Sequence, residues 1–201
     1  MYRILLVGVF LFLLATSALA QEASNQNELT EKNWNDLFAA LDEDQWVTAA
    51  DAATKYLKQL KEEDKDHSLA RLRYILIFAS AGKVTQRQMT YPELDKVLTD
   101  LLGKDIMTPF RRIDPCEGGP GRLGALCVRE TKASGSATNR AGTYIHAFEY
   151  AELEKPFDAG KHKDKYGAVR GLFRGYQLNP NKSTLWIMRL YVEKATLELD
   201  Q

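Results

Sequence analysis

The chain has 201 residues, and its 27 basic and 27 acidic side chains leave a formal net charge of zero at neutral pH. This balance argues against a protein that binds nucleic acid mainly through phosphate contacts. Hydrophobic residues make up 45% of the chain, which is enough for a globular core. Residues 21–102 hold ten basic and fifteen acidic side chains, whereas residues 103–201 hold sixteen and twelve. The asymmetry favours two modules with different surfaces.

Residues 1–20 have the features of a cleavable signal peptide. Arg3 supplies a positive charge, residues 4–14 are apolar, and Ala18-Leu19-Ala20 is the small-x-small pattern that signal peptidases cut. The apolar run is shorter than the roughly 20 residues that span a bilayer, which disfavours a permanent anchor. We therefore predict a mature chain beginning at Gln21, a periplasmic or secreted location, and a disordered polar leader over residues 21–29.

Residues 30–102 show helical periodicity, and we expect an antiparallel helical mini-bundle there. A first helix carries Trp34 to Leu41, and a second runs from Trp46 to Leu60. Ser68 can cap a third helix, which is apolar nearly all round and should be central; we expect it to stop at Gly82. The fourth opens with the capping box Thr90-Tyr91-Pro92-Glu93 and closes at Gly103.

The two middle helices resemble a tetratricopeptide-like helical hairpin. The stretch AALDEDQWVTAADAATKYLKQL, followed by SLARLRYILIFASAGKV, has the small alanines and the approximate length of one such repeat. Because one repeat cannot bury its own face, the resemblance implies a helical cap or mini-bundle rather than a long solenoid.

After Gly103 the pattern changes to strands and turns, so the predicted fold class is α+β. The candidate strands are residues 104–113, 124–131, 142–153, 166–177 and 184–199. Glycines in the fourth strand indicate bends, and a phase change near Glu193 and Lys194 indicates a bulge in the fifth. We expect residues 103–201 to form a small five-stranded antiparallel β-barrel.

The segments GKDIMTPFRRI and YGAVRGLFRGYQLNPNKSTLWIMRLYVEKATLEL resemble the oligonucleotide/oligosaccharide-binding (OB) fold of small exported bacterial proteins. The resemblance covers residues 103–199. It implies a barrel that binds through one face, with aromatic rings as stacking platforms and cations along phosphate or sugar.

Cys116 and Cys127 are the only cysteines, and ten residues separate them. Export places them where disulfides persist, so we predict a Cys116–Cys127 disulfide. A metal site is disfavoured because no histidine lies nearby in the sequence.

No set of residues supports a catalytic, metal or cofactor site, and we expect none. His67 and His162 lie in charged segments, while His146 belongs either to the edge of the core, with its hydrogen bonds satisfied, or to a ligand groove. The glycines of the segment GGPG at 118–121 precede no helix and give no phosphate loop. Glu149, Glu152 and Glu154 fit a solvated strand face better than the carboxylate pair of a glycosidase.

One cationic and aromatic set forms a candidate ligand face. It consists of Arg170, Arg174 and Tyr176 in one strand, and Tyr144, Phe148 and Tyr150 in another. The alternative is that these large residues fill the core of a small barrel.

The sequence thus favours a noncatalytic exported binding or scaffolding module of the cell envelope, partnered by another envelope protein or a glycan. Two alternatives are a small envelope hydrolase acting on a glycan and an extracytoplasmic nucleic-acid binder, the second opposed by a mature net charge near −1.

Overall fold

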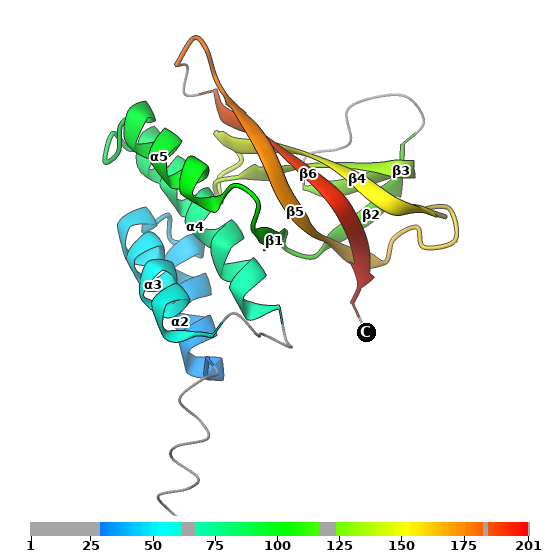
Figure 1. Cartoon of the computed structure of the whole chain (residues 1–201), viewed down its shortest axis with the longest axis horizontal. Helices are drawn as coiled ribbons and strands as arrows, with labels where there is room; N and C mark the ends of the chain where they lie inside the picture. Colours follow the sequence, from blue (N-terminus) through cyan, green and yellow to red (C-terminus); the bar gives the residue numbers. More distant parts are fainter. Residues whose placement is uncertain (1–28, 62–66, 117–123, 183–184, 201) are drawn as a thin grey trace, which may run out of the picture.

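The computed structural model describes residues 29–61, 67–116, 124–182 and 185–200, in which four helices precede six strands (Figure 1). The α+β class is therefore confirmed, whereas the predicted signal peptide and residues 21–28 of the leader lie outside the described residues. No helix of the described part is long and apolar enough to cross a membrane. The helices are α2 (Glu31–Asp42), α3 (Trp46–Gln59), α4 (Ser68–Thr85) and α5 (Tyr91–Leu101). The strands are β1 (Asp105–Met107), β2 (Arg111–Pro115), β3 (Ala125–Thr138), β4 (Ile145–Phe157), β5 (Tyr166–Leu178) and β6 (Trp186–Leu199).

Capping residues fix the starts of two helices. At α5 the Thr90 hydroxyl accepts a hydrogen bond from the Glu93 amide, and the Glu93 carboxylate accepts one from the Thr90 amide. The predicted capping box is thus confirmed, with Pro92 in the first turn. Thr30 and Asn33 make the same reciprocal pair at α2.

Helix α4 is the central helix, and it continues through Gly82 to Thr85. The prediction that Gly82 ends the helix is therefore wrong. The reason is packing: a Cβ atom at this position would lie 2.6 Å from two ring carbons of Trp46. Trp46 begins α3, is fully buried, and meets Phe78 of α4 edge to face with ring centroids 5.3 Å apart. Gly82 is thus the contact point that lets α3 and α4 approach.

Replacing Gly82 by Ala should destabilise the protein, although alanine is the better helix former by about 1 kcal/mol. We expect the free energy of unfolding to fall by about 1–3 kcal/mol, because the added methyl group overpacks the Trp46 ring. Urea denaturation measures the free energy of unfolding of Gly82→Ala, of Trp46→Leu and of the variant that carries both changes. In a Trp46→Leu background the same change should be neutral or stabilising, and an unchanged penalty there would contradict the packing argument.

The strands form one six-stranded mixed sheet rather than the antiparallel five-stranded barrel that was predicted. Their order is β1-β5-β2-β3-β4-β6, and β5 also pairs with β6, so the hydrogen-bonded pairs return to β5 in a closed ring of five strands. The β2–β3 and β4–β6 pairs are parallel, and the other pairs are antiparallel. Alternation of side chains does not encode strand direction, which depends on the path of the connections.

Strand bounds also differ from the prediction in an informative way. The expected first strand is split into β1 and β2, both paired with β5. Between them the Thr108 hydroxyl accepts a hydrogen bond from the Val169 amide at 3.0 Å. The bulge predicted near Glu193 and Lys194 is confirmed by a register shift against β4 and a positive φ of 50° at Lys194.

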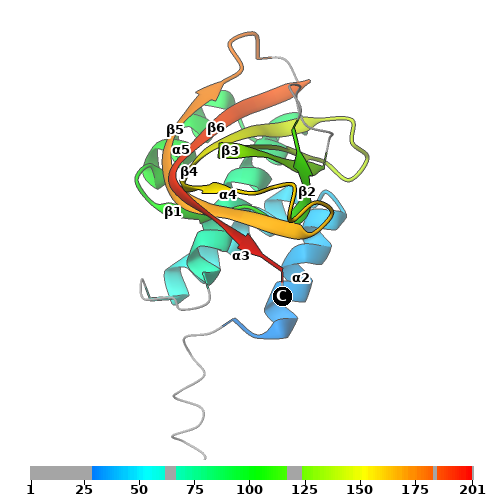
Figure 2. The ribbon, with the colours of Figure 1, turned by 90° about the vertical axis from the view of Figure 1, so that its right-hand side faces the viewer.

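The hydrophobic core crosses the predicted boundary at residue 103. Figure 2 looks onto the strands, with the helices behind them. Helices α4 and α5 contribute Ile77, Val84 and Leu98, and the strands contribute residues such as Phe173 and Leu190 to the same cluster. A second cluster joins α2, α3 and α4. Helix α4 therefore belongs to both cores and couples the helices to the sheet.

A buried polar cluster ties α4 to β2 and β4. Arg111 donates to both oxygens of Glu149, and its Nη2 also donates to the Tyr74 hydroxyl at 3.1 Å. The Tyr74 hydroxyl in turn donates to Glu149. Burial and the adjacent Glu149 charge hold the pKa of Tyr74 well above its usual value. Burial opposes the charge of Arg111, but the attraction of Glu149 outweighs it and raises the Arg111 pKa. Gly135 provides the space, because a Cβ there would lie 2.6 Å from the Arg111 guanidinium.

Removing one charge of this pair should cost far more stability than removing both. Glu149→Gln leaves the Arg111 guanidinium buried without its counter-charge, and we expect a loss of about 3–5 kcal/mol. A double change of Arg111 to Met and Glu149 to Leu removes the need for pairing and should cost much less. Chemical denaturation of both single variants and the double variant measures the coupling; simple additivity of the losses would contradict the cluster as described.

Candidate functional site

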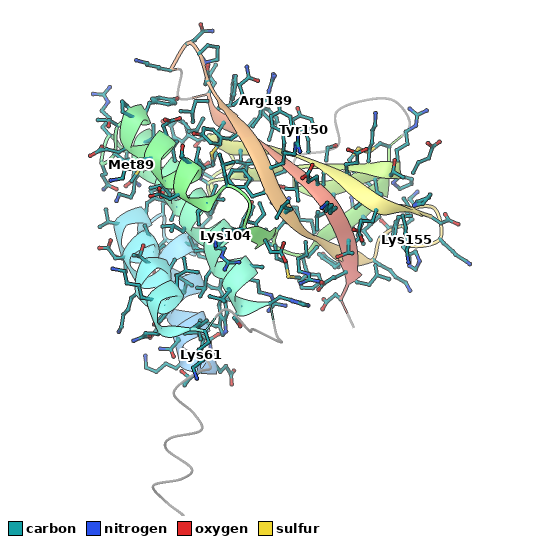
Figure 3. The ribbon with its side chains drawn as sticks, viewed as in Figure 1. Lys61, Met89, Lys104, Tyr150, Lys155 and Arg189 are labelled. Carbon is teal, nitrogen blue, oxygen red and sulfur yellow. A yellow bond between two sulfur atoms is a disulfide. The ribbon has the colours of Figure 1, made fainter. Side chains whose placement is uncertain are left out.

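A broad groove of about 1210 Å³ lies over the curved sheet, lined by β3, β4, β5, β6 and the two cysteines. We call it the tyrosine groove. Its aromatic and charged lining residues are Tyr150, Tyr176, Tyr191, Arg129, Lys132, Arg174, Glu152 and Glu193. Figure 3 labels Tyr150, which lies over the strands and away from α2 and α3. The groove is therefore built on strands rather than on loops, a rigid base for binding.

Two exposed tyrosines form the centre of this groove. Tyr150 of β4 and Tyr191 of β6 are register partners, and their rings stack with centroids 5.7 Å apart and an interplanar angle of 20°. The neighbouring strands place only Ser134 and Gly175 opposite them, so nothing large covers the rings. Tyr150 is 41% exposed and Tyr191 is 38% exposed. Paired rings left open to solvent offer a flat apolar surface with polar edges.

Charged side chains of both signs line the groove around the tyrosines. Arg174 of β5 forms an ion pair with Glu193 of β6 at 2.9 Å. Arg129, Lys132 and Glu152 form no ion pair with any other described residue. The lining thus holds three cations and two carboxylates. No group of three metal-binding side chains occurs among the described residues.

The predicted disulfide is confirmed, and it forms part of the groove wall. Cys116 lies just beyond β2 and is bonded to Cys127 of β3, with Cα atoms 5.5 Å apart. That separation is ordinary for a disulfide. The parallel register of β2 and β3 places Asp114 opposite Cys127, which brings the two cysteines within reach. The cross-link therefore holds the end of β2 against the strand that carries Arg129 and Lys132.

The structure brings together half of the predicted ligand face. Arg174, Tyr176 and Tyr150 line the tyrosine groove. The Tyr176 hydroxyl, however, is shared with helix α5, where it lies 2.8 Å from both Asp95 Oδ1 and Thr99 Oγ1. Burial is the main cause that raises the Tyr176 pKa. Tyr176 therefore anchors α5 to β5 at the edge of the groove.

The other three predicted residues lie outside the groove lining. Arg170 belongs to a separate cluster, with Glu198 at 3.1 Å and the His67 ring at 3.1 Å. Phe148 meets Trp186, with ring centroids 6.3 Å apart, and Tyr144 is exposed. None of these three lines the groove.

Sequence reasoning missed Tyr191, Arg129 and Lys132. A signal for Tyr191 was present: it is out of phase with the buried series Met188, Leu190 and Val192, and so had to face away from them. Lys132 had no comparable signal, because the segment that begins with it has the composition of a loop although β3 continues through it. Arg129 falls within the expected strand 124–131, where nothing distinguished it from any other exposed strand residue.

The burial of the other candidate residues, three glutamates and one histidine, shows which of them can face a ligand. Glu149 is 4% exposed and paired with Arg111, so its placement on a solvated face is wrong. Glu152 and Glu154 are exposed as expected. His146 is fully buried between Trp46 and Phe78, with ring centroids 4.7 and 4.9 Å away. It is a core residue, but neither ring nitrogen has a hydrogen-bond partner in the described part, so the expectation of a satisfied histidine is wrong.

Burial lowers the pKa of His146 to about 4, below the value of about 6.5 expected in the unfolded chain. The neutral ring is thus favoured by folding: the contribution is complete above pH 6.5 and is lost as the pH falls towards 4. We expect about 3 kcal/mol of stability to be lost over this window. Chemical denaturation at several pH values gives the free energy of unfolding as a function of pH. Between pH 4 and 6.5 this free energy should change less steeply with pH in His146→Leu than in the wild-type protein, and equal slopes would contradict the assignment.

No known protein-family model matches this chain, no curated protein sequence matches it, and no solved structure matches it. The geometry of the site therefore carries the functional argument.

Proposed function

We propose that this protein is an exported, noncatalytic binding module of the cell envelope that holds a polymeric glycan in the tyrosine groove. The observation that carries the proposal is the stacked, exposed pair Tyr150 and Tyr191. The C–H groups of a sugar ring pack against the electron-rich face of an aromatic ring. Sugar hydroxyls can bond to the charged groups beside it, here Arg129, Lys132 and Glu152. The ring of five strands supports an OB-like interpretation of residues 103–199.

Charge favours a glycan over nucleic acid. The three cations of the groove face two carboxylates, and Arg174 is already paired with Glu193. A strand of nucleic acid would need several unpaired cations along its phosphates, and its binding would weaken steeply with salt. A sugar polymer needs no such excess.

The carboxylates favour binding over hydrolysis. A glycosidase requires a pair of carboxyl groups, one on each side of the scissile bond. Glu149 is held by Arg111 and Tyr74, and Glu193 is paired with Arg174. Glu152 is then the one carboxylate in the described groove lining without a cationic partner among the described residues.

Export to the periplasm or the extracellular space fits the chemistry of the chain. The disulfide that forms the groove wall is stable in an oxidising compartment. The same compartment contains the polymeric glycans of the envelope. The tetratricopeptide-like interpretation of α3 and α4 adds a second surface for an envelope protein partner.

The test is glycan binding to the mature protein, measured by calorimetry with chitohexaose and with an alginate hexasaccharide. Tyr191→Ala and Tyr150→Ala should each weaken binding about fivefold or more, because one stacking ring contributes about 1–3 kcal/mol. The matched control is Tyr166→Ala, since Tyr166 is 53% exposed but does not line the groove.

Each alternative function has its own outcome in this experiment. Equal loss in the Tyr166 control, or no loss in either groove variant, contradicts the proposed site. Salt-dependent binding of single-stranded DNA in preference to both oligosaccharides would favour a nucleic-acid binder. Shortened oligosaccharides after incubation would show a hydrolase.

A further inference from the structure

A second and more enclosed cavity lies between the helices and the start of the strand region. Its volume is about 510 Å³, within the range of small-molecule sites. One wall comes from α2 and α4, where Phe38, Leu41 and Ile75 line it. Met107 at the end of β1 and Phe110 in the link from β1 to β2 also line it. We call it the helix–strand cavity; its walls are apolar on both sides.

The polar lining of this cavity is predominantly cationic. Arg71 of α4 is half-buried and Arg140 beyond β3 is exposed, and the guanidinium group of neither forms an ion pair or hydrogen bond with another described residue. The one acidic side chain in the described lining is Asp42, and it makes no ion pair with either arginine. A half-buried guanidinium without a counter-charge favours an anion beside it.

The buried cluster supplies further donors to this cavity. Arg111 and Tyr74 both line it. Three of the five guanidinium N–H donors of Arg111 are used in the bonds to Glu149 and Tyr74, which leaves its Nε and one Nη1 donor. Ser136 and Thr138 of β3 also line the cavity, and their hydroxyl groups make no hydrogen bond to a described residue. Because Glu149 balances Arg111, the unbalanced charge of the lining comes from Arg71 and Arg140.

We propose that the helix–strand cavity binds a single-chain amphipathic anion, an acyl chain with a carboxylate head. The chain lies between the apolar walls of α2, α4 and the β1–β2 link. The head group lies beside Arg71 and Arg140, and it accepts hydrogen bonds from the hydroxyls of β3. Charge complementarity selects the anion, since a cationic or neutral head would leave Arg71 unpaired.

The test uses the full mature chain and sodium decanoate below its micelle concentration, with decanol and decyltrimethylammonium as neutral and cationic counterparts. Calorimetry should detect decanoate binding, weaker binding of decanol, and no binding of the cation. The double change Arg71→Gln with Arg140→Gln should weaken decanoate binding about tenfold or more and bring it to the level of decanol. Arg87→Gln, which changes an exposed arginine outside the cavity, should leave binding unchanged.

A second variant tests the apolar part of the cavity. Phe38→Ser alters a wall residue that is 47% exposed, so it should weaken decanoate and decanol alike without unfolding the protein, as circular dichroism and the melting temperature will show. Binding of the cation as tight as that of decanoate, no decanoate binding up to millimolar concentration, or binding unaffected by loss of both arginines would each overturn the proposal. Tyr191→Ala should leave decanoate binding intact, which separates this site from the tyrosine groove.

Discussion

The ion pair of Arg111 and Glu149, closed by the Tyr74 hydroxyl, is the constraint on which the rest of the structure depends. Two charges buried in a core are tolerated only when their hydrogen bonds are made, and these bonds need α4, β2 and β4 at fixed distances. The pair also excludes any side chain at Gly135, on the neighbouring strand. One polar cluster therefore sets how the helices sit on the sheet, and apolar packing completes the arrangement.

Local patterns in the sequence predict much of the fold. The four helices, the capping box at Thr90, the change to strands after Gly103 and the bulge at Lys194 all follow from spacing and from the properties of single residues. Strand direction and the length of α4 do not. The sequence around Gly82 predicts a helix end, and only the contact with the Trp46 ring, 36 positions away in the chain, explains why the helix continues.

The candidate site was only partly predictable for the same reason. Arg174, Tyr176 and Tyr150 line the groove. Arg170 instead forms an ion pair with Glu198 and contacts the ring of His67, and both residues are remote from it in sequence. Glu149 looks like any solvent-facing strand carboxylate until Arg111 is brought beside it. Tyr150 and Tyr191 become a pair only through the parallel register of β4 and β6. The candidate site thus depends on the register of the strands, which the alternation of side chains alone leaves undetermined.

The closed ring of five strands also affects the tendency of the protein to aggregate at high concentration. A sheet with two open edges offers rows of unpaired amide and carbonyl groups to which another chain can add, and this is a common route to aggregation. Here every strand of the ring has a partner on each side over part of its length, and the added strand β1 is three residues long. So short an edge is a poor template for another copy. The fold is thereby protected against runaway strand addition at high protein concentration.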